Sequence, residues 1–176
     1  MKERYVIDTN VLIAASAIEA NSPIAKDATP EDPELRKIVN DWLYEFDTST
    51  SRLVLDGEGQ IHDEYCNKLG FNDYGRQVVI HKWSTCNYDQ VEVVYDDENC
   101  GYLEEPLSSV VHDRSDRKMV AAALEAIKCY GECAIANAAD TDWYDWEEAL
   151  RASGIFVEQI IDEWAKDKWL EKSHHA

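Results

Sequence analysis

Short apolar runs alternate with helical segments along the chain, and this alternation constrains the fold more than any other feature. The runs lie at residues 5–7, 52–55, 91–95, 133–136 and 155–157. Segments of helical composition or periodicity lie at residues 11–17, 33–46, 57–69, 72–84, 112–128, 144–152 and 158–170. Strands separated by helices predict a mostly parallel sheet of about five strands with helices on both faces, a three-layer α/β/α sandwich.

The length of 176 residues fits one domain, 1–176, with one sizeable core. We expect residues 158–176 to form an added carboxyl-terminal helix and tail. Residues 21–33 contain three prolines and predict a loop.

Acidic residues occupy the positions at which the predicted strands end or the next helices begin. They are Asp8 after the first run, Glu64 in the helix after the second, Asp116 at the helix after the third, and Asp140 and Asp142 after the fourth. Ligands of parallel sheets bind at the carboxyl ends of the strands, so we expect these side chains to converge. Carboxylate oxygens are the ligands that Mg²⁺ and Mn²⁺ prefer. Two carboxylates 4 Å apart repel by about 4 kcal/mol at an effective dielectric constant of about 20, so such a cluster requires cations or protons.

Four segments, in this order, resemble those of the PIN-domain nucleases. They are YVIDTNVLIAAS, IHDEYCNKLG, HDRSDRKMVAAAL and AIANAADTDWYDW, and the resemblance covers about residues 4–157. The resemblance implies a PIN-like fold whose catalytic and metal-binding residues are Asp8, Glu64, Asp116 and Asp140. It implies Asp142 as an auxiliary metal ligand and Asn10 as a residue that orients the site.

The same resemblance implies an activity and a setting. The activity is that of a metal-dependent endoribonuclease that uses Mg²⁺ or Mn²⁺, two ions per site, to activate a water for in-line attack on a phosphodiester bond. The substrate would be a defined RNA, tRNA-like or otherwise structured or single-stranded. A toxin or phage-defence role in the cytoplasm, with an antitoxin or defence-complex partner, is expected, and a homodimer remains open.

The chain departs from the family pattern in three places. Ala138 stands where the family often has Ser or Thr two residues before the fourth acid. The 21–33 loop, the 96–106 loop and the terminal helix are additions to the compact members of the family. Asp113 competes with Asp116 for the third acidic position, and Asp63 competes with Glu64 for the second.

The charge of the chain limits how it can bind nucleic acid. Its 36 Asp and Glu residues against 17 Lys and Arg residues give a net charge of -19. Such a surface repels phosphates, which excludes a non-specific, salt-driven nucleic-acid binder and a membrane-surface binder. The few bases that could contact substrate phosphates are Arg114, Arg117 and Lys118 around Asp116, and a second group of Lys68, Arg76, His81 and Lys82. The alternative for both groups is ion pairing with neighbouring acids.

Other features bear on compartment and substrate. Five cysteines, an odd number without a CxxC pair, favour a reducing cytosol over a disulfide framework. No apolar stretch approaches the roughly 18 residues of a membrane span. Trp143, beside the fourth acid, is the tryptophan that we expect to be best placed for stacking on a base.

Each acid also has a structural interpretation: Asp8 as a helix N-cap, Asp116 as a charge at a helix N-terminus, and Asp140 as part of an Asx turn. Two other functions remain open. A non-catalytic acidic protein that mimics nucleic acid and binds a basic partner would explain the charge. A haloacid-dehalogenase-like phosphatase also begins with a strand that ends in Asp, but it needs a second Asp where Asn10 stands.

Overall fold

A five-stranded sheet, parallel throughout, forms the centre of the molecule. The computed structural model describes residues 1–18, 22–26 and 28–175. Within these residues the strand order is β3-β2-β1-β4-β5. The strands are β1 (Arg4–Ile7), β2 (Arg52–Asp56), β3 (Tyr88–Val91), β4 (Ala134–Asn137) and β5 (Phe156–Gln159). The predicted parallel α/β sheet is therefore confirmed.

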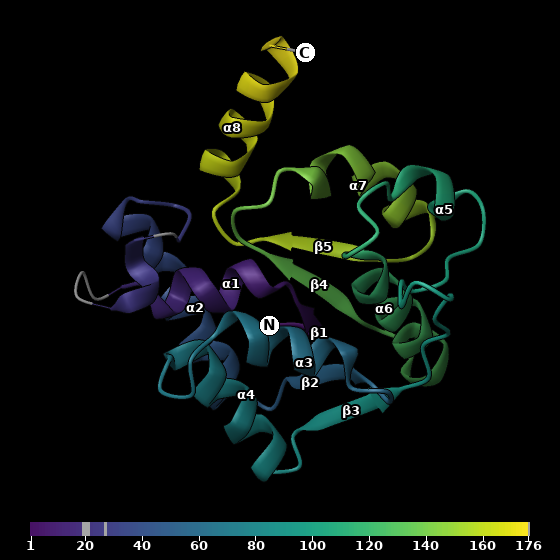
Figure 1. Cartoon of the computed structure of the whole chain (residues 1–176), viewed down its shortest axis with the longest axis horizontal. Coiled ribbons are helices and arrows are strands. Elements are labelled where there is room, and N and C mark those ends of the chain that lie inside the picture. The colour runs from purple at the N-terminus through teal and green to yellow at the C-terminus, as the bar shows by residue number, and fades with distance from the viewer. Residues whose placement is uncertain (19–21, 27, 176) are drawn as a thin grey trace.

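Helices cover both faces of the sheet, so that the molecule has three layers (Figure 1). They are α1 (Thr9–Ser16), α2 (Pro33–Thr48), α3 (Gln60–Lys68), α4 (Tyr74–Ser84), α5 (Leu107–Val110), α6 (Arg117–Tyr130), α7 (Asp142–Ala152) and α8 (Asp162–His175). Helices α1, α2 and α4 contact one another on one side, while α6 and α7 pack on the strands from the other side. Helix α3 contacts α1, β2 and α6. Helix α8 projects from the body beyond β5 and contacts α7.

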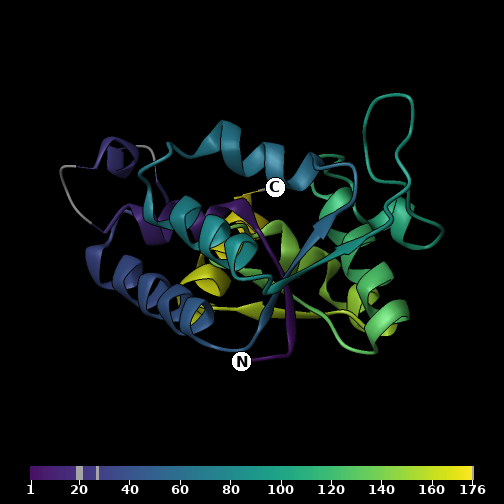
Figure 2. The ribbon, with the colours of Figure 1, turned by 90° about the horizontal axis from the view of Figure 1, so that it is seen from below.

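The strand order reverses at β1, which lies between β2 and β4. Tyr5 pairs with Leu53 on one side and with Ala134 on the other. Figure 2 shows β1 and β2 running away from the amino terminus, so that their carboxyl ends share one edge of the sheet. Ligands of doubly wound sheets bind at such a switch point, and Asp8 directly follows β1 there.

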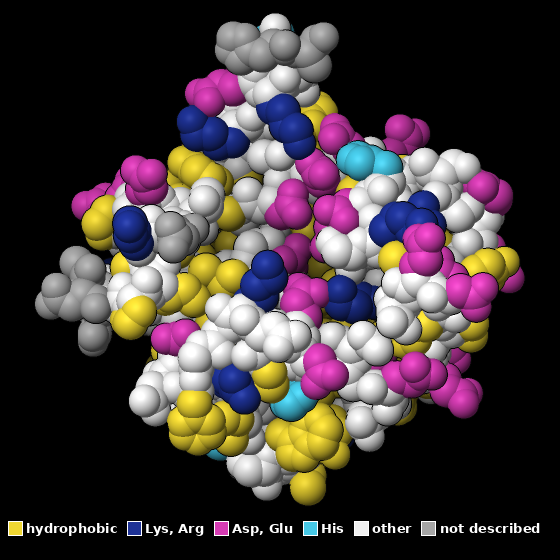
Figure 3. Space-filling model, in the orientation of Figure 1, with side chains coloured by type: hydrophobic (Ala, Val, Ile, Leu, Met, Phe, Trp, Pro, Cys, Tyr) yellow, Lys and Arg dark blue, Asp and Glu magenta, His cyan; other side chains and the backbone are white. Residues whose placement is uncertain are grey.

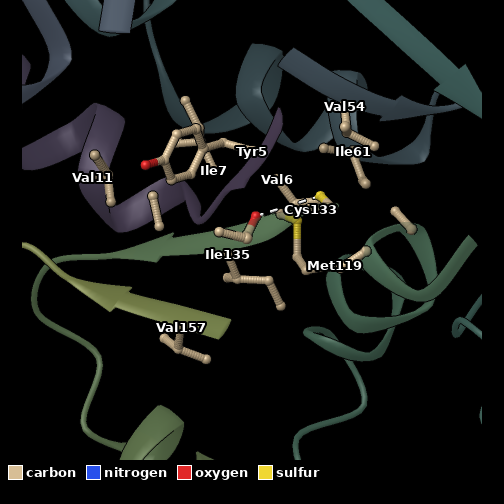
Figure 4. Packing of buried hydrophobic residues seen from close by; sticks show 14 of the residues in the cluster. Tyr5, Val6, Ile7, Val11, Val54, Ile61, Met119, Cys133, Ile135 and Val157 are labelled. Carbon is tan, nitrogen blue, oxygen red and sulfur yellow. Dashed lines mark hydrogen bonds between the residues drawn. The ribbon is translucent and has the colours of Figure 1, made fainter. Parts of the chain in front are cut away.

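The core lies on both faces of the central strands. Tyr5, Val6 and Ile7 are completely buried, and the alanine-rich side of α6 lies against the sheet. Figure 4 shows Met119 of α6 reaching toward Cys133 at the start of β4. Fully burying one large apolar side chain contributes about 1.5–3 kcal/mol, so the strand that ends in Asp8 is anchored firmly.

At the opposite edge, an ion-pair cluster joins the amino ends of three strands. Asp89 of β3 accepts hydrogen bonds from Nε of Arg4 at 2.9 Å and from Nε of Arg52 at 2.8 Å. Burial raises the pKa of Asp89, but the hydrogen bonds from Arg52 and Arg4 outweigh burial and hold the pKa below its usual value. The charged side chains at the amino edge of the sheet are therefore paired with one another. The candidate ligand site lies at the carboxyl edge.

Several predicted boundaries are wrong. The third strand, expected at 91–95, is residues 88–91, because pairing with β2 begins at Tyr88 and ends at Val91. The last helix, expected at 158–170, spans 162–175, because Glu158 and Gln159 belong to β5. Glu158 accepts hydrogen bonds from Tyr5 and Trp42, which hold it in the sheet. The 21–33 loop contains a short 3-10 helix (Pro23–Lys26), and residues 21 and 27 of it lie outside the described part.

Candidate active site at the carboxyl edge of the sheet

Asp8 sits at the base of the site and is 7% exposed. One carboxylate oxygen accepts the backbone N–H of Asn10 at 2.9 Å, which caps α1, and the other accepts Nε1–H of Trp143 at 2.6 Å. The helix-cap interpretation of Asp8 is therefore correct, but it describes only one of the two oxygens. Trp143 is completely buried, so the expectation that it stacks on a base is wrong. Its indole orients Asp8 instead.

Asn10 fixes the loop that carries Asp140. The amide oxygen of Asn10 accepts the backbone N–H groups of Ala138 and Ala139 at 2.9 and 3.1 Å, and its amide nitrogen donates to Oδ1 of Asn137 at 2.9 Å. Asn137, fully buried, donates in turn to the backbone oxygen of Asp140 at 2.8 Å. This network joins the start of α1 to the β4–α7 loop without a hydroxyl at position 138.

Asp140 is half-buried and takes part in the predicted Asx turn, because its Oδ1 accepts the backbone N–H of Asp142 at 2.9 Å. Burial raises the pKa of Asp140, and the nearby negative charge of Asp142 raises it further. The hydrogen bond from the Asp142 backbone acts in the opposite direction. The turn therefore holds this carboxylate at the rim.

Glu64 on α3 lies across the site and is held by two side chains. The hydroxyl of Thr9 donates to Oε1 of Glu64, and Nζ of Lys118 lies 2.6 Å from its Oε2. The competing acid, Asp63, has a side chain that is 72% exposed, against 24% for that of Glu64. Glu64 is thus the better placed of the two.

Asp116 immediately precedes α6, and its carboxylate does not cap that helix. Its competitor Asp113 accepts hydrogen bonds from the backbone N–H and the hydroxyl of Ser115, at 2.8 and 2.7 Å. Those bonds hold the pKa of Asp113 below its usual value. Burial and the charges of neighbouring acids, Asp8 first among them, raise the pKa of Asp116 to about 8. The charge of Asp113 also acts on Asp116 and on Asp140, so Asp113 lies near the site as well, with its carboxylate held by Ser115.

The structure brings Asp8, Glu64, Asp116 and Asp140, which we call the acid cluster, near one another. The negative charges of the other three act on Asp116, and those of Asp140 and Glu64 act on Asp8. Burial is the largest cause that raises the pKa of Asp8, to about 7. Figure 3 shows the face of the molecule that is seen in Figure 1, with Asp and Glu side chains gathered in a hollow at its centre.

The donor chemistry of the acid cluster fits a hard divalent cation, since its side chains offer only oxygen ligands and one lysine, Lys118, offsets only part of their negative charge. Within the described residues, however, no group of three His, Cys, Asp or Glu side chains is arranged as a ready ligand set for one ion. Lys118 holds Glu64, which keeps one carboxylate paired with an ammonium group.

Asp142, the predicted auxiliary acid, begins α7 and has two basic neighbours. Nζ of Lys172 lies 2.5 Å from its Oδ1, and Nε2 of His112 lies 3.4 Å from its Oδ2. Nδ1 of His112 accepts Nε1–H of Trp146 at 3.2 Å, which leaves the proton of a neutral His112 ring on Nε2, facing Asp142. Asp142 therefore lies at the rim, between α8 and the end of the 96–112 segment.

The three bases expected to contact phosphates are all engaged within the chain. Arg114 forms ion pairs with Asp96 at 2.7 Å and with Glu98 of the acidic loop. Arg117 donates from Nε and from a terminal nitrogen to the carbonyl oxygens of Val111 and Ser108, at 2.9 and 2.7 Å. Arg114 and Lys118 therefore form ion pairs with neighbouring acids, which was the predicted alternative to phosphate contact. Arg117 instead donates hydrogen bonds to backbone oxygens.

The acidic 96–106 loop also lies against the start of α6, beside the site. A Cβ atom at Gly101 would lie 2.6 Å from Cα of Lys118, so only glycine permits this approach. Figure 2 shows this loop standing out from the body on the same side as the carboxyl ends of β1 and β2. The loop therefore borders the acid cluster.

The second basic group is largely structural. Lys82 is fully buried and donates to the carbonyl oxygens of Ser49 and Ser51, at 3.1 and 2.8 Å. His81 lies 2.7 Å from Asp47, and Arg76 donates to the carbonyl oxygens of Cys66 and Leu69. Of this group, Lys68 is exposed at the end of α3.

Sequence reasoning missed four participants: Thr9, Asn137, His112 and Lys172. Thr9 lies between the predicted residues Asp8 and Asn10, and Asn137 is a single amide in an otherwise apolar run before Asp140, so both positions were a usable signal. The contacts of His112 and Lys172 come from distant segments, so no local pattern could have indicated them.

Two further findings concern the chain as a whole. No helix in the described ranges is long and apolar enough to cross a membrane. The chain matches no protein-family model, no curated protein and no solved structure.

Proposed function

We propose that this chain is a divalent-metal-dependent endoribonuclease of the PIN-domain type. The observation that supports the proposal most is the meeting of four acids from four separate segments at the β1/β4 switch point, where their charges act on one another. Surface acids of a folded chain have no reason to gather at that edge, because their repulsion costs free energy.

The side chains of the acid cluster would hold Mg²⁺ or Mn²⁺ as a pair of ions, because four carboxylates balance the charge of two divalent cations. A bound cation would supply positive charge that stabilises the phosphate and lowers the pKa of a water. Trp143 and the Asn10 backbone fix the two oxygens of Asp8, and Thr9 fixes Glu64. Lys118 would leave Glu64 and become available for a substrate phosphate.

We propose RNA as the substrate, in the toxin or defence setting that the sequence resemblance implies. A partner that inserts an Arg or Lys among the acids would silence the site, since Lys118 shows that an ammonium group is accepted there. We also propose a cytoplasmic location. The five cysteines all lie in the described part of the chain, and each is a free thiol.

The test is cleavage by the purified chain of labelled RNA and DNA, with Mg²⁺, with Mn²⁺ and with a chelator. Asp8→Asn keeps an oxygen to cap α1 but removes the charge, so we expect loss of cleavage by at least about 100-fold with little loss of stability. Asp41→Asn, on the exposed side of α2, is the matched control and should cleave normally. Cleavage that persists in chelator or in Asp8→Asn would refute the proposal.

The second candidate is a non-catalytic acidic protein that binds a basic partner. The ammonium groups of Lys118 and Lys172 within reach of Glu64 and Asp142 favour it, because they show that the site receives cationic side chains. This function predicts no metal-dependent cleavage by the wild type.

A further inference from the structure

One face of α8 carries an aromatic and two basic side chains. Trp164, Lys168 and Lys172 follow one another at intervals of four residues, which places them on the same side of a helix. Figure 3 shows lysine side chains on α8, above the hollow in which the acids gather. This face therefore borders the candidate site.

The lower part of this face lines a cavity of about 480 Å³ beside the acid cluster. Its lining residues are Thr29, Glu31, Asp32, Ala139, Trp164 and Lys168. Ala139 directly precedes Asp140, so the cavity adjoins the loop that carries a member of the cluster. Its volume lies within the range of small-molecule sites, about 300–1,000 Å³, and is large enough for one nucleotide.

The upper part of the face reaches the rim of the site directly. Lys172 lies 2.5 Å from Asp142, and the charges of Asp140 and Asp145 also act on its ammonium group. Lys168 pairs with Glu171 at 2.8 Å, with side chains that are 47% and 63% exposed. Exposed pairs of this kind contribute about 0–1 kcal/mol, so Lys168 can exchange its partner at little cost.

Helix α8 is held in this position by α7. The rings of Tyr144 and Trp169 stack with centroids 5.9 Å apart, and Nε1 of Trp169 donates to Asp145 at 2.7 Å. The hydroxyl of Tyr144 donates to the carboxylate of Asp162 at 2.7 Å. These contacts set the distance between α8 and the site before any ligand binds.

We infer that the α8 face formed by Trp164, Lys168 and Lys172 binds a single-stranded segment of the RNA substrate next to the acid cluster. This inference rests on the proposed nuclease function. One base would enter the cavity and stack on Trp164, while phosphates on either side contact Lys168 and Lys172. Aromatic stacking together with cationic contacts is how proteins bind single strands.

The charges of the cavity suit a base and not a phosphate. Glu31 and Asp32 lie in its wall, and Asp32 is already engaged with the backbone N–H of Glu34 at 2.9 Å. A carboxylate such as Glu31 accepts hydrogen bonds from the amino group of a base but repels a phosphate. Arg114 and Arg117 are held by residues 96–111, whereas Lys168 pairs with an exposed glutamate and Lys172 with Asp142 at the rim of the site, so the two α8 lysines lie where a strand beside the cluster would pass.

The experiment measures binding of a fluorescent single-stranded RNA oligonucleotide in Ca²⁺, with the RNA checked for integrity afterwards. We expect Lys168→Gln and Lys172→Gln each to weaken binding about 3- to 10-fold at low salt, and each to reduce the slope of log affinity against log salt by about 0.7. Lys166→Gln, an exposed lysine of the same helix, is the matched control and should change neither quantity.

Two variants of Trp164 distinguish a loss of base stacking from a loss of folding. Trp164→Phe should keep most of the affinity, whereas Trp164→Ala should lose about 5- to 100-fold without changing the salt slope. Circular dichroism melts of both variants check that α8 still forms. An equal loss in the Phe and Ala variants would overturn the stacking part of the inference.

The outcomes distinguish this inference from the proposed function. If the wild type cleaves RNA with metal, but the two lysine variants bind it with unchanged affinity and slope, the inference is wrong and the nuclease proposal stands. If the wild type binds RNA through α8 and does not cleave it, the inference holds and the nuclease proposal fails. If the wild type neither binds nor cleaves RNA, both are wrong.

Discussion

Nζ of Lys118 lies 2.6 Å from Oε2 of Glu64, so an ammonium group sits at the edge of the acid cluster. The side chain of Lys118 is only 11% exposed, and its Nζ also donates to the carbonyl oxygen of Ser115 at 2.6 Å. A divalent cation that takes Oε2 of Glu64 as a ligand would compete with this lysine for the same oxygen. The positive charge of Lys118 also opposes a cation bound elsewhere on this carboxylate.

Lys118→Gln should therefore strengthen metal binding. The substitution removes a positive charge near the cation and frees Glu64, and we expect the Mn²⁺ concentration for half-maximal thermal stabilisation to fall about 3- to 10-fold. The measurement is the melting temperature as a function of Mn²⁺. Lys128→Gln, a lysine paired with Glu125 on the same helix, is the control and should behave as the wild type. Unchanged or weaker Mn²⁺ binding in Lys118→Gln would contradict the idea that Lys118 competes with metal.

The stability of the metal-free protein should depend on pH through the acid cluster. The pKa values of Asp8 and Asp116 are raised by burial to about 7 and about 8, so the folded chain holds protons that the unfolded chain releases near pH 4. This stabilisation is present at low pH and is lost as pH rises through the folded pKa values. The unfolding free energy in chelator should thus fall between about pH 5 and about pH 8.

Urea denaturation in EDTA across this range measures the effect. Asp8→Asn should flatten the dependence, because a neutral amide does not titrate, and added Mn²⁺ should reduce it by favouring the charged carboxylates. Asp41→Asn should retain the full slope. A stability that rises from pH 5 to pH 8 in the chelated wild type would show that the charges of the cluster do not interact as described.

Trp143→Phe should reduce activity more than its effect on stability predicts. The variant keeps an aromatic ring in the core but loses the N–H group that orients Asp8. Trp146→Phe is the matched control, because Trp146 is equally buried, packs against Trp143 at 5.1 Å and donates to His112 instead. We expect each variant to lose about 1–3 kcal/mol of stability, and only Trp143→Phe to lose about 10-fold or more in cleavage rate. Equal losses of activity would assign Trp143 a purely structural role.

Asn10→Ala should loosen the loop that carries Asp140. Two backbone N–H groups, of Ala138 and Ala139, would lose their acceptor, which costs about 1–3 kcal/mol per buried unsatisfied group. Hydrogen exchange at these two amides should become faster, while exchange in β2 stays slow. Unchanged protection at both amides would show that the loop is held by other contacts.

The fold was predictable because its signal is local. Apolar runs and helical periodicity lie within short windows, and they indicated the parallel sheet and the order of most helices and strands. The boundaries of β3 and β5 were wrong because pairing across the sheet decides them. Val93 and Val94 look like strand residues, but the ladder with β2 ends at Val91. Helix α5 was missed, since it has only four residues and little periodicity of its own.

Asp8 and Asp140 follow the strands β1 and β4, and parallel topology places such positions on one edge of the sheet. Glu64 lies inside α3 and Asp116 precedes α6, so their assignment depends on the family resemblance and stays a prediction. The pairing partners of the acids were not predictable. Lys118 was expected to contact the substrate, but from the first turn of α6 its side chain also reaches Glu64 on α3. Lys172 lies 30 residues from Asp142 in sequence, and only the direction in which α8 leaves the sheet brings the two together.

The direction of α8 has a practical consequence for any study of this protein. The amino terminus lies at the far edge of the sheet, before β1 (Figure 2), whereas α8 leaves from the other side and its Lys172 reaches Asp142 at the carboxyl rim. An affinity tag fused after Ala176 would extend from the helix that borders the acids, and a histidine tag there would bring additional metal ligands close to them. A tag placed before Met1 keeps those ligands on the opposite side of the molecule. Metal titrations and cleavage assays are best made with the amino-terminal fusion, or with the tag removed.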